Sequence, residues 1–245
     1  MCSSKNGRLA TPFPRSYLPY LQVCPGFTQY GSQLILAVIN DHIPLNDLQT
    51  IALSGVLLSN LAHLCSVYVL YFLSKGIYMK SDHAKQIALG AALLHTVSPA
   101  GMFLSSPYTE SLFAFLNFSG SALYLRGMSR LYGHATISQR LQVVAAGCLF
   151  GIATTIRSNG LLSGLPFLYD AVARTWAIAN HGFSSRRLYD LASLMIGGLL
   201  VSSGLVIPQI VAYRMYCTDS IADARQPWCS RTIPSIYVWV QEHYW

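Results

Sequence analysis

Residues 191–213 read LASLMIGGLLVSSGLVIPQIVAY, a stretch of 23 residues without a single Asp, Glu, Lys or Arg. A helix needs about 20 predominantly apolar residues to cross the hydrocarbon core of a bilayer, so this stretch is long enough to span one. Residues 48–74 and 86–109 are likewise free of these charged residues, over 27 and 24 positions. The three windows predict three membrane-spanning helices.

The composition of the whole chain agrees with a membrane protein. Of its 245 residues, 53% are hydrophobic and 10% are charged, whereas a soluble domain carries about 25% charged residues. The mean hydropathy of +0.41, with 15 Tyr and 10 Phe, excludes a disordered chain, which could not bury so much apolar surface. We therefore expect an all-α, polytopic transmembrane protein.

Three weaker windows raise the expected number of spans to about six. Residues 111–125 and 141–156 are charge-free and reach spanning length if polar residues lie at their ends. Residues 161–179 contain Asp170 and Arg174, whose i, i+4 spacing allows them to pair on one helix face. A transporter is disfavoured, because the sequence has neither an internal repeat nor a buried charge pair at mid-membrane.

The ends of the chain read differently from its middle. Residues 16–40 are free of formal charge but are interrupted by Pro19, Pro25, Gly26 and Gly31, so we expect an interfacial or re-entrant segment within residues 1–47. Membrane spans then occupy residues 48–213, and a loop occupies 214–245. Together they form one transmembrane domain, 1–245. The abrupt start and end suggest a piece of a longer protein.

Basic residues gather in alternate connectors, which indicates the orientation of the spans, because cytoplasmic loops carry the excess of Lys and Arg. They are Lys75, Lys80 and Lys85, then Arg126, Arg130 and Arg140, then Arg174, Arg186 and Arg187. The net charge of +7 therefore indicates membrane topology and not nucleic-acid binding. Three polar segments, 105–110, 157–160 and 214–245, are expected together on the opposite side of the membrane.

The cysteines carry a prediction about the tail loop. In an oxidising compartment Cys217 and Cys229 could form a disulfide that closes this loop, whereas Cys65 and Cys148 lie within spans. No cysteine has metal-ligand spacing with a histidine, so we expect no metal.

Glu110 is the first candidate site residue. Ser106 and Pro107 are typical of an N-cap followed by the first residue of a helix, here expected over 107–124. Glu110 then lies in the first turn, where it could simply complement the helix dipole. Alternatively it belongs to a polar site beside the bilayer. Nearby hydroxyls suit a sugar or a phosphate; they belong to Ser105, Ser106, Tyr108 and Thr109.

Arg157, Ser158, Asn159 and Gly160 form the second polar corner, with Asn-Gly as a turn signal and Gly160 as a helix C-cap. Arg157 at a helix C-terminus could complement the dipole and extend its side chain toward the membrane surface. It could equally present a bidentate guanidinium to a lipid-linked phosphate.

The histidines divide into two groups. His63 and His95 lie inside spans, where a neutral imidazole hydrogen-bonded between helices is expected, so they receive no functional role. His243 lies among Trp239, Glu242 and Trp245, a composition typical of the membrane interface. That segment is either an interfacial helix or a loop that contacts substrate.

Three sequence blocks together resemble the PIG-V family of GPI mannosyltransferases. The first is His95 through Phe115, with Ser98-Pro99-Ala100 followed by Ser106-Pro107-Tyr108-Thr109-Glu110. The second is Arg157-Ser158-Asn159-Gly160. The third comprises Pro227-Trp228-Cys229, Pro234-Ser235-Ile236-Tyr237 and Val240-Gln241-Glu242-His243-Tyr244-Trp245.

This resemblance implies a GT-C type glycosyltransferase, multi-pass in the endoplasmic reticulum membrane. Such an enzyme would take mannose from dolichyl-phosphate mannose and add the second mannose, through an α-1,6 bond, to the GPI precursor glycolipid in the lumen. The substrate-binding candidates are Ser106, Tyr108, Glu110, Arg157, Asn159, His243 and Trp245. The donor is a lipid substrate, so no cofactor is implied, and the scheme leaves room for a small membrane accessory subunit.

The catalytic base is not assigned within this chain. In the family it is expected to be the acid of a Trp-Asp motif in an N-terminal luminal loop, and no Trp precedes Trp176 here. Asp41 and Asp47 precede the first clear span, but neither follows a Trp. The alternative to an enzyme is an inactive piece or an accessory membrane subunit of the same pathway.

Overall fold

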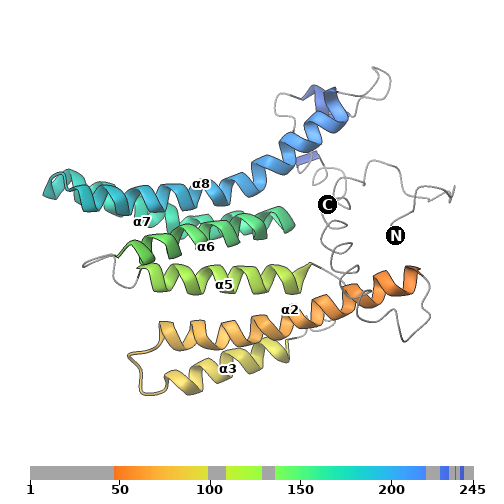
Figure 1. Cartoon of the computed structure of the whole chain (residues 1–245), viewed down its shortest axis with the longest axis horizontal. Coiled ribbons are helices and arrows are strands. Elements are labelled where there is room, and N and C mark those ends of the chain that lie inside the picture. Colours follow the sequence, from red (N-terminus) through yellow and green to blue (C-terminus); the bar gives the residue numbers. More distant parts are fainter. Residues whose placement is uncertain are drawn as a thin grey trace. The chain divides into compact units, whose positions relative to one another are not determined.

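The computed structural model describes residues 47–98, 109–128, 136–218, 227–231, 235 and 238–239, which form helices joined by turns, with no strand among them (Figure 1). Six α-helices follow in order: α2 (Asp47–Ile77), α3 (Ala84–Thr96), α5 (Glu110–Met128), α6 (Ile137–Ile156), α7 (Leu165–His181) and α8 (Ser185–Tyr213). Each overlaps one of the six predicted windows. The interfacial or re-entrant segment predicted in residues 1–47 falls almost wholly outside the described residues.

Three described helical segments are long and apolar enough to cross a membrane: Gly55–Ile77, Ile137–Ile156 and Ser185–Tyr213. The window 86–109 differs from its prediction, because α3 has 13 residues and at 1.5 Å per residue covers about 20 Å. Its end has a physical cause in the sequence. Pro99 disfavours helical geometry at the preceding residue, so a helix ends before Ser98.

The chain divides into two compact units, residues 1–129 and 130–245, and each is described by itself. In the first unit α3 folds back along α2, and α5 lies against α2 (Figure 1). Small residues line the contacts between these helices; Ala62, Ala88, Ala92, Ser66 and Gly120 are all buried. Close approach through small residues is how helices associate in a bilayer, where apolar burial alone gives no preference.

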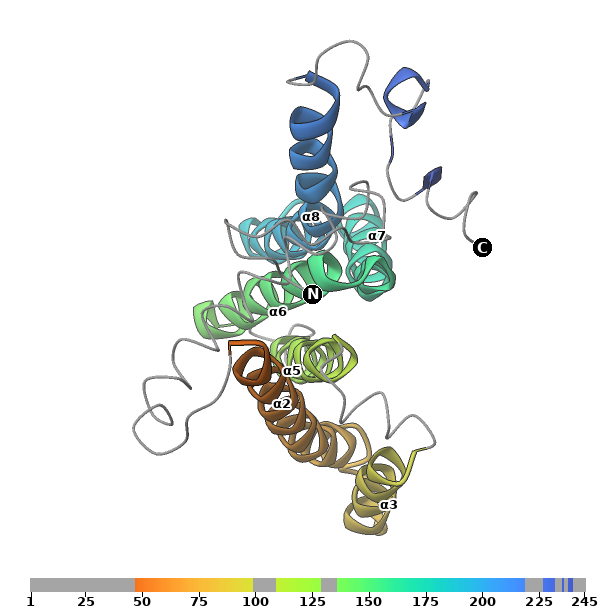
Figure 2. The same cartoon turned by 90° about the vertical axis from the view of Figure 1, so that its right-hand side faces the viewer.

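In the second unit α6 and α7 both pack against α8 (Figures 1 and 2). The α6–α8 contact is a glycine seam: a Cβ placed on Gly147 would lie 2.5 Å from the Gly197 Cα, and one on Gly204 would lie 2.2 Å from the Gly151 carbonyl oxygen. The Phe167 ring of α7 covers Gly197, where an added Cβ would lie 2.3 Å from it. Glycine at position 197 therefore allows α6, α7 and α8 to pack closely.

Large apolar side chains also cover the outer faces of the helices. Leu64 and Leu94 are exposed by 67% and 77% in the first unit, and Leu199 and Trp176 by 66% and 71% in the second. Such a surface would aggregate in water but matches the acyl chains of a bilayer. The helix α8 contains Pro208 and bends along its length (Figure 1), as expected where a proline removes a backbone hydrogen bond.

Candidate functional site

Glu110 is the first residue of α5, one position after Thr109, whose carbonyl accepts the Phe113 N–H at 2.9 Å. The predicted start at Pro107 is therefore wrong by three residues, and the helix runs on to Met128 instead of ending at 124. The Oε2 atom of Glu110 is buried. A carboxylate in a first turn is favoured by the helix dipole, and that stabilisation is compatible with a site at the same position.

The residue after Glu110 connects α5 to α2. Ser111 is completely buried, and its Oγ accepts a hydrogen bond of 3.2 Å from the Ser59 hydroxyl. The two serines form a buried polar contact immediately beside Glu110. Ser106 and Tyr108, which the sequence analysis placed in the same corner, lie outside the described residues.

The two histidines of the first unit meet between helices. The His95 Nε2 of α3 lies 3.1 Å from the Ser66 Oγ of α2, and the Ser66 hydroxyl donates to the His63 carbonyl at 2.7 Å. Because Ser66 has one proton and uses it on that carbonyl, His95 Nε2 must be the donor. The rings of His63 and His95 are 5.1 Å apart. The expected interhelical hydrogen bond is confirmed for His95.

Arg157 lies where α6 ends and a 3-10 helix, η2 (Ser158–Gly164), begins. Its backbone is extended, with φ −142° and ψ 128°, and its N–H donates to the Ala153 carbonyl at 2.9 Å. Ser158 and Asn159 are exposed, and the Arg157 side chain is half-buried. This places a cation at a helix C-terminus beside two accessible polar side chains, as both interpretations of Arg157 require.

Gly160 does not act as the predicted C-cap. Among the described residues the glycine with positive φ is Gly182, at 79°, and Gly160 lies inside η2. Its requirement is for space: a Cβ there would lie 2.7 Å from both the N and the Cα of Thr154. The Gly160 N–H also donates to the Arg157 carbonyl at 2.9 Å. The glycine therefore holds the turn against α6 and fixes the backbone that carries Arg157.

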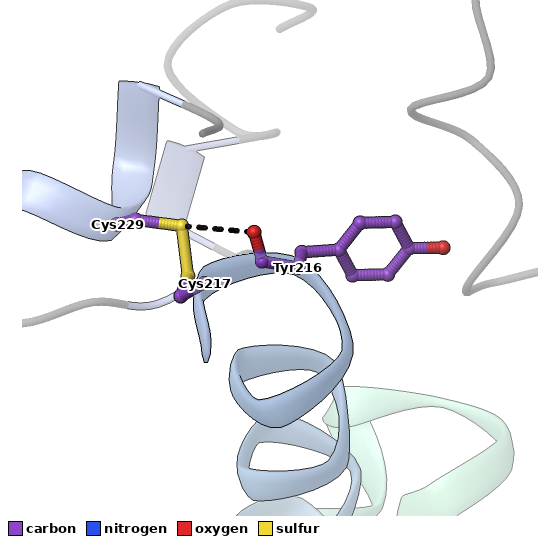
Figure 3. The surroundings of a disulfide bond; sticks show 3 residues. All are labelled: Tyr216, Cys217 and Cys229. Carbon is purple, nitrogen blue, oxygen red and sulfur yellow. Dashed lines mark hydrogen bonds between the residues drawn. A yellow bond between two sulfur atoms is a disulfide. The ribbon is translucent and has the colours of Figure 1, made fainter. Parts of the chain in front are cut away.

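A disulfide between Cys217 and Cys229 links the end of α8 to the tail that follows it (Figure 3). This is the pair predicted from the sequence. Cys217 lies in the π-helical turn η3 (Arg214–Thr218), and Cys229 lies in the 3-10 helix η5 (Pro227–Ser230). The Cys229 Sγ lies 3.8 Å from the Tyr216 carbonyl oxygen. A disulfide sulfur carries no proton, so this approach is a contact and not a conventional hydrogen bond.

A small core surrounds this disulfide. Trp228 is 2% exposed and packs with Ala212 and Cys217, with Tyr216 and Trp239 against them. Burial raises the pKa of the Tyr216 hydroxyl above its ordinary value of 10.0. The tail thus has packing of its own at the end of α8. His243 and Trp245, the candidates predicted in its last residues, lie outside the described residues.

One ion pair was missed by the sequence analysis. The Arg140 Nε of α6 donates to the Asp190 Oδ1 of α8 at 2.8 Å, and the Arg140 guanidinium lies 5.4 Å from the centre of the Tyr189 ring. Asp190 is buried to 6% exposure. The partners are 50 residues apart, so no local pattern could have paired them, although both flank predicted spans on the expected cytoplasmic side.

The described candidate residues lie in both units: Glu110 in the first, and the Arg157 corner and the disulfide-closed tail in the second. In the ranges that the structure covers, no three His, Cys, Asp or Glu side chains gather as a metal site. The absence of a metal cofactor remains a prediction. What the groups offer chemically is a carboxylate, a guanidinium and accessible amide and hydroxyl groups.

The described residues define an α-helical membrane protein with polar corners at the ends of closely packed helices. The chain belongs to the PIG-V mannosyltransferase family: the family profile described as Mannosyltransferase (PIG-V) matches residues 12–245. The family that the sequence resembles is thereby confirmed, and with it a glycosyltransferase family.

Individual relatives agree with the family. The chain is 41% identical over 194 residues to GPI mannosyltransferase 2 of Aspergillus oryzae, covering 79% of this chain and 44% of that protein. It is 44% identical over 187 residues to the protein of the same name in Aspergillus fumigatus, covering 76% and 42%. GPI alpha-1,6-mannosyltransferase 2 of Mus musculus is 32% identical over 185 residues, covering 66% and 34%.

The chain spans less than half the length of these three relatives. No solved structure matches it significantly.

Proposed function

We propose that the protein to which this chain belongs transfers the second mannose of the GPI anchor, through an α-1,6 bond, from dolichyl-phosphate mannose to the GPI precursor glycolipid. The observation that carries this proposal is the family match, which extends over residues 12–245 and includes both polar corners. The names of the fungal and mouse relatives supply the acceptor class and the bond. The bilayer, the donor lipid and the acceptor glycolipid are the proposed partners, and an accessory subunit would appear as a co-purifying membrane protein.

We propose a GT-C type, six-span arrangement in the endoplasmic reticulum membrane, with the polar corners in the lumen. The disulfide at the end of α8 supports a luminal tail, since such bonds form in oxidising compartments. Alternation of the six helices then places the Glu110 and Arg157 corners on that same side. The basic connectors fall on the cytoplasmic side, as the positive-inside rule requires.

Within this arrangement the candidate residues take complementary roles. An inverting transfer needs a base for the acceptor hydroxyl and donors for the departing phosphate. Arg157 would bind the donor phosphate with its bidentate guanidinium, Glu110 would contact the sugar or the acceptor, and Asn159 or His243 would assist. The base would come from the Trp-Asp loop expected in the family and absent from this chain.

The experiment uses a complete family member that contains these residues, expressed in cells that cannot add the second mannose. The variants Glu110→Gln and Arg157→Ala should each abolish the addition, measured as mannose-labelled GPI intermediates. Arg157→Lys separates the two interpretations, because lysine retains the charge near the helix end but loses the bidentate geometry. Lys80→Ala, on an exposed residue of the α2–α3 connector, is the control. Unchanged GPI intermediates in both Glu110→Gln and Arg157→Ala would refute these roles.

A further inference from the structure

Polar side chains on one face of α2 contact both neighbouring helices of the first unit. Ser59, His63 and Ser66 are spaced i, i+4 and i+7, so they lie on one side of the helix. Ser59 bonds to Ser111 of α5, and Ser66 bonds to His95 of α3. Ser59 and Ser66 are 4% and 0% exposed, so both hydroxyls are buried where these helices meet.

Contacts near both ends of α5 fix its register on α2. Ser59 contacts Ser111 near the start of α5, and the Leu125 side chain near its end would lie 3.3 Å from a Cβ on Gly76. The contacting positions rise together along both helices, so α2 and α5 run in the same direction.

The helix α3 also contacts α5, at a position between Ser111 and Leu125. The His95 ring, held by Ser66, meets the Phe118 ring of α5 edge-on, with the ring centroids 5.4 Å apart. Phe118 follows Ser111 by seven residues, as Ser66 follows Ser59. Two positions of α5, seven residues apart, therefore contact two positions of α2 that are also seven residues apart. Ser111 contacts Ser59 directly, and Phe118 is linked to Ser66 through His95.

We propose that Ser59 and Ser66 are positioning residues for Glu110 in the mannosyl transfer, an inference that rests on the proposed function. Glu110 is bonded covalently to Ser111, so the Ser59–Ser111 hydrogen bond sets the height and rotation of the first turn of α5. The Ser66–His95–Phe118 contacts hold the next turns. Without them α5 can rotate or slide against α2, and the carboxylate leaves its working position.

In a membrane, hydrogen bonds of these serine hydroxyls contribute strongly to the register of the helices. Lipid gives apolar side chains no preference for the helix interface, so the registry of α2 and α5 depends on close packing and hydrogen bonds. Deleting one interhelical hydrogen bond of this kind is expected to lower the rate of a step that depends on it by roughly three- to fifteen-fold.

The test measures kcat and KM in membranes containing a complete family member with Ser59→Ala or Ser66→Ala. The matched control is Ser74→Ala, because Ser74 is also buried in α2, at 7% exposure, and its hydroxyl makes no hydrogen bond to α3 or α5 within the described residues. Both test variants should lower kcat by roughly three- to fifteen-fold, with KM for the donor and the amount of folded protein at the assay temperature unchanged. The control should match the parent.

The same serine variants are then measured on a Glu110→Asp background, which keeps a carboxylate and therefore leaves transfer to measure. A positioning role predicts little further loss there, because the carboxylate being positioned has already been displaced. Equal losses on both backgrounds, or losses that follow the amount of folded protein, would overturn the inference in favour of a general structural role. If Glu110→Gln is impaired while both serine variants keep full kcat, the inference alone fails. If Glu110→Gln is fully active, the proposed role of Glu110 fails with it.

Discussion

Replacing Gly204 with alanine should open the seam between α6 and α8. The added Cβ would lie 2.2 Å from the Gly151 carbonyl oxygen and 2.9 Å from the Thr154 Cβ. Since ordinary contact begins near 3.4 Å, the first distance falls short by about 1.2 Å. The opposing oxygen belongs to the backbone, so no side-chain rotation relieves the clash and the helices must separate.

The expected cost follows from two opposing effects. Overpacking a close contact costs up to about 3 kcal/mol, and alanine returns up to about 1 kcal/mol through its higher helix propensity. The net destabilisation should be about 2 kcal/mol, or a melting temperature lower by roughly 4–8 °C for a cooperatively unfolding chain of this full length. Gly90→Ala is the matched control, because a Cβ on this α3 residue meets no atom within 4 Å.

Thermal unfolding in detergent micelles, followed by the helical circular dichroism signal, measures this difference. Gly90→Ala should melt at or slightly above the parent temperature, and Gly204→Ala clearly below it. A Gly204→Ala protein that melts with the control would show that the α6–α8 contact does not depend on glycine at this position, and the packing argument would be wrong.

Further substitutions test the other contacts. Gly160→Ala should lower transfer activity in a complete family member while the protein stays folded at the assay temperature, because the turn carrying Arg157 must move. A loss of activity that is explained by the loss of folded protein would contradict this. Cys217→Ser should weaken the tail by about 2–3 kcal/mol and speed its proteolysis in vesicles oriented with the tail outward; unchanged cleavage would argue against a structural disulfide. Arg140→Gln should destabilise the second unit by about 1–2 kcal/mol, discounted for the 21% exposure of the arginine side chain. Adding Asp190→Asn should recover most of that loss, and no recovery would exclude the ion pair as its cause.

The positions of most of these helices could be predicted because long charge-free stretches are typical of membrane-spanning helices. The ends of the helices could not be predicted from charge-free length. The helix α8 begins at Ser185, six residues before its window, because the charged residues there find partners: Arg187 donates to the His181 and Gly182 carbonyls at 3.0 and 2.8 Å, and Asp190 binds Arg140. A charge-free window therefore marks the most apolar part of a helix and not its full length.

The candidate site was predictable only as single residues. Glu110 and Arg157 were found because each stands alone beside long apolar stretches, where a charge is costly and conspicuous. The contacts that hold Glu110 were not found, because Ser59 and Ser111 are 52 residues apart, and Ser66 and His95 are 29 apart. Only the packing of the helices brings these side chains together.

Gly160 shows how a correct residue can be given the wrong reason. Asn159-Gly160 is typical of a turn in which glycine takes positive φ, and a turn does occur there. The backbone instead enters a 3-10 helix, and the glycine is needed because Thr154 lies too close for any side chain. Local pattern predicts conformation, but it carries no information about a neighbour six residues back in a different helix.

The two polar corners therefore depend on different interactions, close glycine packing for one and side-chain hydrogen bonds for the other. The Arg157 corner lies at the end of α6, whose contact with α8 is made by glycines, so it should respond to added volume and tolerate the loss of hydroxyls. The Glu110 corner lies on α5, which hydroxyl and imidazole groups tie to α2 and α3, so it should respond to the loss of a donor. Since a bilayer gives helices no hydrophobic reason to pair, each corner depends on whichever short-range contact its own helices make.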